Sequence, residues 1–224
     1  MPSTPHGNAA KSRSRQRARK AGSPQQAPMR TLDLLGALTT FARNGVIFSE
    51  GQPAECVYKI ESGCVRTYAM PQTGERQLVA FHVPGDCFAL EGGDVHMMSA
   101  EATTDSTIRV IKRKALMARK NDAGMMRHLL DLTGAELRRT QRHNMLLLKG
   151  AQERVIGFIL EIKERGHSDG EIALDMTRRD IADYLGLTIE TVSRTLSRLE
   201  AESAISLPTP WRIVLHDPAA LNLQ

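Results

Sequence analysis

Apolar and polar positions alternate in short runs between residues 46 and 82, a spacing that predicts β-strands with one buried face. We expect strands near 46–48, 56–61, 64–70 and 76–82. Turns with glycine, among them Ser-Gly and Pro-Gly, separate these runs. Short strands joined by such turns are typical of a small antiparallel roll. The pattern therefore predicts a β-roll, jelly-roll-like, over residues 29–120.

The apolar spacing changes to a helical period over residues 121–149. Seven positions alternate by four and three residues, as the a and d positions of a coiled coil do. They are Met126, Leu130, Thr133, Leu137, Thr140, Asn144 and Leu147. Only four of the seven are apolar, so two interpretations stay open. Either this helix pairs with a second copy of the chain, or it packs on its own domain.

Residues 150–224 predict a helix-turn-helix followed by a wing, which makes the whole chain an α+β protein. An amphipathic helix over 151–165 comes first. Thr177 and Asp180 have the spacing of a capping box, Gly186 supplies a tight turn, and Thr188 caps the next helix. The strands "AISLP" and "WRIVLHD", broken by "PTP", then form the hairpin of the wing.

The second helix of this unit, "TIETVSRTLSRL", has one apolar and one polar stripe. The apolar stripe packs on the first helix, so the polar stripe faces outward and can enter a DNA major groove. The polar stripe consists of Glu190, Ser193, Arg194 and Ser197. Arginine pairs with guanine O6 and N7, and glutamate accepts from cytosine N4. Ile189, at the helix start, either meets a thymine methyl group or packs in the core.

Residues at the starts of the two helices are placed for phosphate contacts. Thr177, Arg178 and Arg179 begin the first helix, and Thr188 and Thr191 begin the second. We expect these residues and Ser197 to support DNA binding through the backbone of the duplex. The alternative for the arginine pair is a solvated surface without a specific role.

The net charge of +5 does not by itself indicate a DNA-binding C-terminal region. Residues 1–30 contribute +7, while residues 151–224 carry −4. Residues 1–28 are rich in Pro, Ser, Gln and Arg, so we expect a disordered basic tail. Such a tail either contacts phosphates weakly or is only solvated, and its composition also fits an organellar transit peptide.

The stretch "TRRDIADYLGLTIETVSRTLSRLE" resembles the DNA-recognition motif of the Crp/Fnr superfamily, and of its FixK-like branch in particular. That branch shares the Glu-x-x-Ser-Arg signature, here Glu190 to Arg194. "VYKIESGCVRTY" and "PGDCFALE" resemble the effector domain of the family. The resemblance extends over roughly residues 30–217. It implies a homodimeric transcription activator that binds double-stranded DNA at a palindrome of TTGA-type half-sites.

In this resemblance, Glu190 and Arg194 read the G·C pair and Ser193 contacts a neighbouring thymine. The helix over 121–149 becomes the dimer helix, which spaces the recognition helices about one DNA turn apart. RNA polymerase is the implied partner, and the "PQTGER" hairpin is its candidate contact.

The effector region departs from relatives that bind cyclic nucleotides, which carry a Gly-Glu and an Arg-Ser pair. Ala89-Leu90 and Met98-Ser99 stand at these places, so nothing pairs a cyclic phosphate. Other relatives hold an iron–sulfur cluster, which needs about four thiolates. This chain has three cysteines, Cys56, Cys64 and Cys87, which we expect to be small core residues or, less simply, redox sensors. We therefore expect no cofactor and control through the abundance of the protein, downstream of an oxygen-responsive system.

Other classes of function fit the sequence less well. No run reaches the roughly 18 apolar residues of a membrane span, which favours a cytoplasmic bacterial protein that binds no membrane. A cupin-like enzyme needs clustered histidines, but His82 and His96 form no His-x-His pair. We expect no catalytic or metal site. A haem- or nitric-oxide-dependent sensor of the same superfamily stays open as the alternative, with His82, His96, His128 and His143 as the available ligands.

Overall fold

The computed structural model of the chain describes residues 32, 35–71, 74, 76–165 and 171–216. The predicted disordered tail and its basic cluster lie outside these residues. The described strands are β1 Ala37–Phe41, β2 Val46–Phe48, β3 Cys56–Ser62, β4 Val65–Ala69, β5 Gln77–His82, β6 Cys87–Phe88, β7 Ser99–Ala102, β8 Ser106–Lys112, β9 Glu171–Ala173, β10 Ile205–Thr209 and β11 Arg212–Leu215. The described helices are α2 Arg113–Met117, α3 Ala123–Leu147, α4 Ala151–Arg165, α5 Arg178–Leu185 and α6 Ile189–Ala201.

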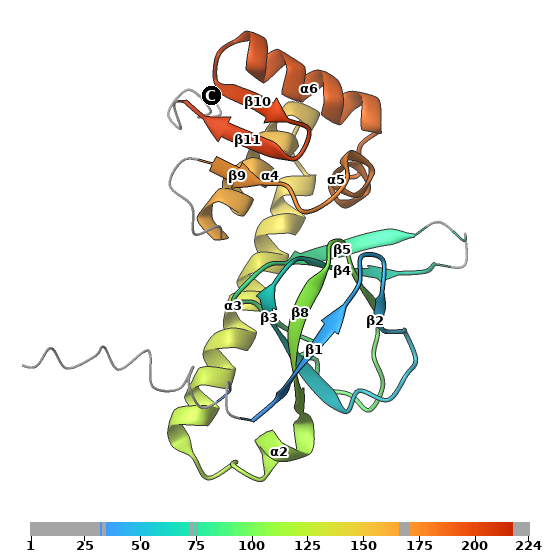
Figure 1. Cartoon of the computed structure of the whole chain (residues 1–224), viewed down its shortest axis with the longest axis vertical. Helices are drawn as coiled ribbons and strands as arrows, with labels where there is room; N and C mark the ends of the chain where they lie inside the picture. Colours follow the sequence, from blue (N-terminus) through green and yellow to red (C-terminus); the bar gives the residue numbers. More distant parts are fainter. Residues whose placement is uncertain (1–31, 33–34, 72–73, 75, 166–170, 217–224) are drawn as a thin grey trace, which may run out of the picture.

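Strands β1 to β8 form a β-roll of two antiparallel sheets (Figure 1). The sheet orders are β1-β8-β3-β6 and β2-β7-β4-β5. The four strands expected from the alternating pattern are β2, β3, β4 and β5. The pattern did not predict β1, β6, β7 and β8. Strand β6 has only two residues, and four of the five residues of β1 are exposed, so neither strand has a buried face that an alternating pattern could indicate.

Helix α3 runs along the β-roll and leads to the C-terminal unit, which comprises α4 to β11 (Figure 1). The helix begins where the Asp122 side chain accepts a hydrogen bond from the Met125 backbone N–H, 3.0 Å away. It ends at Leu147, and α4 begins four residues later at Ala151. Among the helices that the structure describes, none combines the length and the hydropathy needed to cross a bilayer.

The wing differs from the expected two-stranded hairpin in two ways. Strand β10 continues through Pro208 to Thr209, so "PTP" does not break it. Proline is tolerated there because β10 lies at the edge of the sheet, where a missing N–H removes no ladder bond. The sheet also has a third strand, since β9 pairs with β11 with Ile172 opposite Ile213. Strand β9 is short and its partner β11 lies far along the chain, so no local turn or alternation indicated the pairing.

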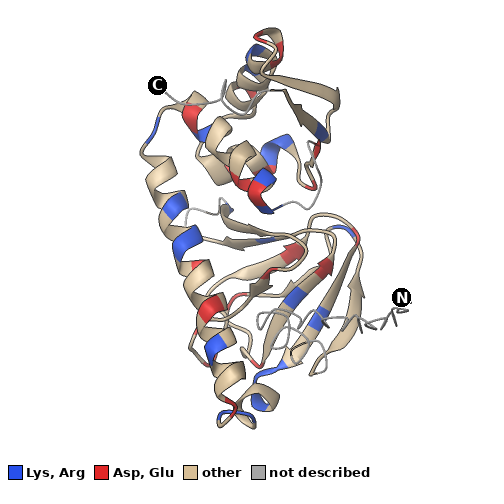
Figure 2. Cartoon of the chain, turned by 90° about the vertical axis from the view of Figure 1, so that its left-hand side faces the viewer, with Lys and Arg blue, Asp and Glu red and all other residues tan. Residues whose placement is uncertain are grey.

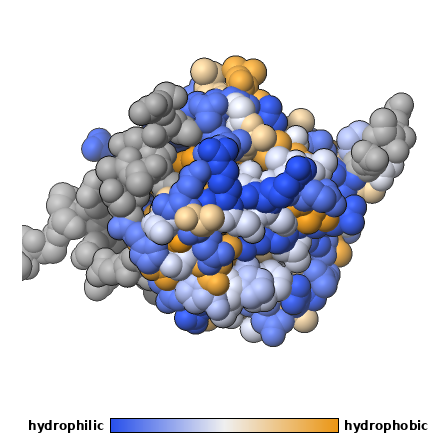
Figure 3. Space-filling model, turned by 90° about the horizontal axis from the view of Figure 1, so that it is seen from above, coloured by the Kyte–Doolittle hydropathy of each residue, from blue (hydrophilic) through white to orange (hydrophobic). Residues whose placement is uncertain are grey.

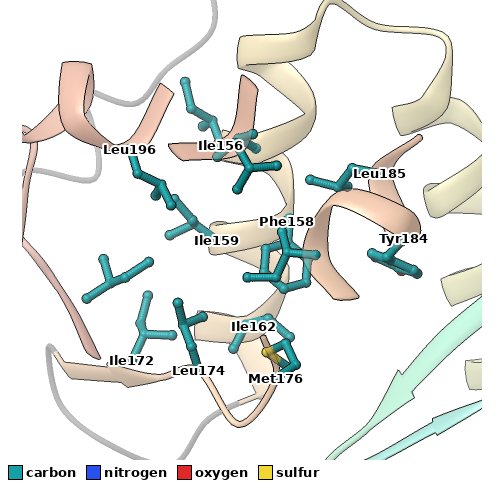
Figure 4. Packing of buried hydrophobic residues seen from close by; sticks show 14 of the residues in the cluster. Ile156, Phe158, Ile159, Ile162, Ile172, Leu174, Met176, Tyr184, Leu185 and Leu196 are labelled. Carbon is teal, nitrogen blue, oxygen red and sulfur yellow. The ribbon is translucent and has the colours of Figure 1, made fainter. Parts of the chain in front are cut away.

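A large apolar cluster joins the C-terminal unit to the β-roll. Figure 4 shows the apolar face of α4 turned toward α5, α6 and the β9 segment, with Phe158 and Ile159 among the central residues. Phe81 of β5 belongs to the same cluster, with its ring centroid 6.1 Å from Phe158 and 5.2 Å from Tyr184. The β-roll and the C-terminal unit therefore share one hydrophobic core across their junction.

Candidate DNA-binding site

The ends of α5 and α6 are fixed by the predicted caps. Thr177 Oγ1 accepts from the Asp180 backbone N–H at 3.1 Å, and an Asp180 carboxylate oxygen accepts from the Thr177 N–H at 3.1 Å, which completes a capping box. Gly186 adopts a left-handed φ of 60° and ends α5. Thr188 Oγ1 accepts from the Thr191 N–H at 3.2 Å and starts α6. These three local predictions, the capping box, the turn at Gly186 and the Thr188 cap, are confirmed.

Arg154 of α4 supports the turn between the two helices, a role that the sequence did not indicate. Its Nη1 donates to the carbonyl of Leu185 at 3.0 Å and to that of Gly186 at 3.5 Å. Its Nε donates to the Lys149 carbonyl at 2.9 Å. The guanidinium thus ties the turn to the start of α4. Because 31 residues separate Arg154 from Leu185, no local motif reveals the contact.

The polar stripe of α6 faces outward. Val192, Leu196 and Leu199 are buried, with at most 3% of each residue exposed. Glu190, Ser193, Arg194 and Ser197 are exposed. Ile189 is 36% exposed, so its side chain is not a core residue. The end of the molecule that carries α6 and the wing, seen from above in Figure 3, is mainly hydrophilic. The apolar stripe holds the helix and leaves its polar stripe available to a partner.

Glu190 and Arg194 offer opposite hydrogen-bonding capacities one turn apart. The pKa of the Glu190 carboxyl group is lowered, first by the backbone N–H of Glu190 and then by the Thr188 hydroxyl, so the side chain is an ionised acceptor at neutral pH. Arg194 is a donor, and its Nε reaches the Glu190 carbonyl at 3.4 Å. An acceptor beside a donor matches the exposed edges of a C·G pair in the major groove.

The residues expected to contact phosphates differ in their exposure and in the hydrogen bonds that they already make. Arg179 is exposed at the start of α5. Arg178 is half-buried, and its Nη1 is buried without a hydrogen-bond partner among the described residues. The Thr177 hydroxyl already donates to Asp180 at 2.7 Å. The Thr191 hydroxyl lies 3.0 Å from that of Thr188. The two arginines therefore keep N–H donors for a phosphate, whereas the Thr177 hydroxyl proton is already bonded to Asp180.

The predicted seam on α3 is largely uncovered. Leu130 is 72% and Leu137 is 58% exposed, and Thr133, Thr140 and Asn144 are exposed as well. The hydroxyls of Thr133 and Thr140 donate to carbonyls one turn back, so neither demands a polar partner across an interface. The ends of the seam differ from the expectation: Leu147 is half-buried and Met126 packs on a cluster of the β-roll.

A cavity of about 360 Å³ lies between the β-roll and α3. Ala89, Leu90 and Met98, the residues at the places of nucleotide-contacting pairs in the resemblance, line it together with Leu137 and Thr140 of α3. Ser99 does not line it, and its hydroxyl accepts from the Glu50 N–H at 3.0 Å. Among the lining residues that the structure describes, none is an arginine or a lysine. These walls are thus mainly apolar and offer a phosphate no cation.

The four histidines considered as possible haem ligands occupy structural positions. His82 Nε2 lies 3.2 Å from the Thr67 hydroxyl, and burial lowers the pKa of His82 to about 3. His96 stacks on Phe48 with centroids 3.7 Å apart. His143 stacks on Tyr184, and His128 is half-buried on α3. Within the residues that the structure covers, no three His, Cys, Asp or Glu side chains converge as a metal site would require.

The cysteines are placed as core residues. Cys64 and Cys87 are buried and Cys56 is half-buried. Burial raises the pKa of the Cys64 thiol to about 12, which leaves the reactive thiolate unpopulated at neutral pH.

A β-roll, a long helix with an uncovered apolar stripe and a winged helix-turn-helix define a class of DNA-binding transcription regulators. The chain belongs to the Crp/Fnr family. Residues 153–223 match the family model of the Crp-like helix-turn-helix domain, and residues 38–119 match that of the cyclic nucleotide-binding domain. The predicted α+β fold and family are confirmed.

Within this family the chain is a FixK-type regulator. It is 44% identical over 202 residues to the nitrogen fixation regulation protein FixK of Azorhizobium caulinodans, which covers 87% of this chain and 82% of that protein. It is 37% identical over 188 residues to FixK of Rhizobium meliloti, with 83% and 85% covered. The solved structure of FixK2 from Bradyrhizobium japonicum superimposes with a TM-score of 0.79 at 42% identity, covering 83% of this chain and 95% of that one.

Proposed function

We propose that the protein is a homodimeric activator that binds a palindrome of TTGA-like half-sites and needs neither a cyclic nucleotide nor an iron–sulfur cluster. The observation that carries this proposal is the exposed polar stripe of α6 in a capped helix-turn-helix. Two FixK relatives are named as regulators of nitrogen fixation, and we extend that process, under low oxygen, to this chain. We place the protein in the bacterial cytoplasm, where its DNA and RNA polymerase are.

In this proposal the base contacts come from the first two turns of α6. Arg194 donates to guanine O6 and N7, Glu190 accepts from cytosine N4 of the same pair, and Ser193 contacts a neighbouring thymine. Ile189 meets a thymine methyl group, as its exposed side chain allows.

Phosphate contacts come from the N-terminal ends of both helices, where the helix dipoles favour anions. Arg179 approaches from solvent, and a phosphate would supply a partner for the buried Nη1 of Arg178. Thr177, Thr188, Thr191 and Ser197 support these contacts, and Thr177 and Thr188 act mainly as caps.

We propose that the stripe on α3 pairs with the same stripe of a second copy. Exposed leucines in register with short polar residues form a self-complementary surface under two-fold symmetry. Pairing would cover Leu130 and Leu137 and repeat the recognition helix about one DNA turn away. The corresponding domains are residues 29–120, 121–149 and 150–224.

Independence from cyclic nucleotides is supported by the cavity beside α3. A cyclic phosphate there would lose its hydration without gaining a cation, because Ala89, Leu90 and Met98 offer none. The three cysteines are too few for a four-thiolate cluster, and at least two of them are buried in the β-roll.

The same cavity favours one second candidate function, control by a small molecule with a mainly apolar surface. Its apolar lining and its Leu137 and Thr140 wall would connect a bound ligand to the dimer stripe. A haem- or nitric-oxide-dependent sensor belongs to this class. In that case, DNA binding would appear only after the ligand is added.

RNA polymerase is the proposed second partner, as for other activators of the family. The "PQTGER" hairpin remains our candidate contact, although residues 72, 73 and 75 lie outside the described part of the chain.

A titration of the purified ligand-free protein with two labelled duplexes tests the proposal. One duplex carries a TTGA-type palindrome, and the other has both half-sites scrambled. We expect a preference of at least about 1,000-fold, the usual gap between specific and non-specific binding. Equal affinity for both duplexes would contradict the function, and a preference that appears only with an added ligand would favour the second candidate.

A further inference from the structure

The start of α5 is bound to the β-roll by a buried ionic cluster. Arg66 of β4 donates from Nη1 to Asp180 Oδ1 at 2.7 Å and from Nη2 to Glu101 Oε1 at 2.8 Å. Arg76, just before β5, donates to the same Asp180 oxygen at 2.9 Å. The side chains of Asp180 and Arg66 are only 2% and 10% exposed. Figure 2 shows charged residues at this junction between α5 and the roll.

Asp180 thereby has two tasks in one carboxylate. Its Oδ2 accepts from the backbone and hydroxyl of Thr177 and completes the cap of α5. Its Oδ1 receives the two arginines from the roll. A buried carboxylate with four such partners has a fixed orientation, and the planar fork of Arg66 spans two carboxylates at once. The first turn of α5 is therefore held in a fixed position against strand β4.

The ionic cluster joins the C-terminal unit to the β-roll at a further place, away from the covalent connection between α3 and α4. The polypeptide passes from the roll to the C-terminal unit through residues 148–150. Arg165 of α4 forms a second link to Asp86 of the roll. The Arg66–Asp180 contact holds a third element, α5, so rotation of the C-terminal unit about α4 would break a buried ion pair.

The cluster does not cover the surface that reads DNA. Glu190, Ser193 and Arg194 are exposed, and Arg179, next to Asp180, is exposed as well. Helix α6 lies on the side of the C-terminal unit away from the β-roll in Figure 1. A contact that fixes α5 and leaves α6 exposed is suited to positioning the recognition helix, and not to blocking its access to DNA.

We propose that Arg66 and Arg76 of the β-roll are positioning residues for DNA recognition, which act through Asp180 to set the place of each recognition helix relative to the dimer axis. The inference rests on the proposed function, because only a dimer on a palindrome makes that placement matter. Its consequence is selectivity for the spacing between half-sites. One extra base pair moves a half-site by about 3.4 Å and rotates it by about 34°.

The test compares affinities for palindromes whose central spacer has the best length or is one base pair longer or shorter. We expect Arg66→Met to lower the ratio between best and altered spacers by about fivefold or more, as loss of a coupled contact network does. Arg66→Lys keeps the charge but cannot span Asp180 and Glu101. Its ratio of affinities for best and altered spacers should therefore lie between those of the unchanged protein and Arg66→Met. Arg109→Met is the matched control, because Arg109 pairs with Glu61 inside the roll.

Asp180→Asn extends the test to a variant that keeps an oxygen for the helix cap and weakens both arginine contacts. It carries the test should Arg66→Met fail to fold as a dimer. A folded Arg66→Met or Asp180→Asn dimer with the spacer ratio of the unchanged protein would overturn the inference. Tighter binding at every spacer would also overturn it, because the contact would then be inhibitory. If the unchanged protein prefers no palindrome, the proposed function itself fails.

Discussion

At the scale of single residues, recognition depends on which side chains on α6 are free to contact bases. Arg194 is exposed and its Nε makes only a long contact, 3.4 Å, to its own helix. Arg198, one turn further on, is engaged by Glu202 at 2.8 Å and by Gln152 at 3.0 Å. Two exposed arginines of one helix therefore differ in their availability, and substitutions can separate their roles.

We predict that Arg194→Ala costs about 1–3 kcal/mol of binding free energy and relaxes selection at the guanine of the half-site. The measurement is affinity for the palindrome and for duplexes with each other base at that position. Arg198→Ala serves as the control on the same helix and should leave base selection unchanged. An equal loss on every duplex would show that Arg194 contacts phosphate only.

Arg179→Ala should weaken binding to all duplexes by a similar factor. A phosphate contact carries no base information and releases about one counterion, so the salt dependence should fall by about 0.9 in the slope of log K against log salt. Titrations at several salt concentrations measure that slope. An unchanged slope would place Arg179 away from the DNA backbone.

At the scale of elements, the exposed stripe of α3 is the proposed dimer surface. Leu137→Glu places a charge where two copies would bury apolar area, so we expect dissociation to monomers at micromolar concentration. Sedimentation or light scattering measures the mass. Leu38→Glu is a matched control, since Leu38 of β1 is 57% exposed and Leu137 is 58% exposed. A Leu137→Glu protein that remains dimeric would contradict the proposed surface.

The sequence predicted the elements whose signals are local. The capping box of Thr177 and Asp180 lies within four residues, and the turn at Gly186 needs only one residue that tolerates positive φ. The pairing of β9 with β11 was not predicted because the two strands lie far apart in the sequence, so no local turn or alternation indicates it. The contact of Arg66 was not predicted for another reason: its partner Asp180 lies 114 residues away, Arg66 alone resembles an ordinary surface charge, and the sequence indicates only a helix cap for Asp180.

At the scale of the whole molecule, the free energy of unfolding should fall as the solution becomes acidic. Burial lowers the pKa of His82 from 6.5 to about 3, so between these values the unfolded chain binds a proton that the folded chain does not. The contribution of His82 is complete above pH 6.5 and decreases as pH falls, by about 2 kcal/mol between pH 7 and pH 5.

Denaturant unfolding at pH 7 and pH 5 tests this prediction. His82→Gln should lose about 2 kcal/mol less than the unchanged protein over that interval, because glutamine does not titrate. Equal losses for both proteins would mean that His82 is not held neutral by burial.

The central claim for the whole molecule is that the ligand-free dimer reads a palindrome. Selection of bound sequences from a random DNA pool, with metal-free and ligand-free protein, tests it most directly. We predict enrichment of two inverted TTGA-like half-sites whose centres lie about one helical turn apart. No enriched sequence, a single half-site without a partner, or enrichment only after a small molecule is added would contradict the account.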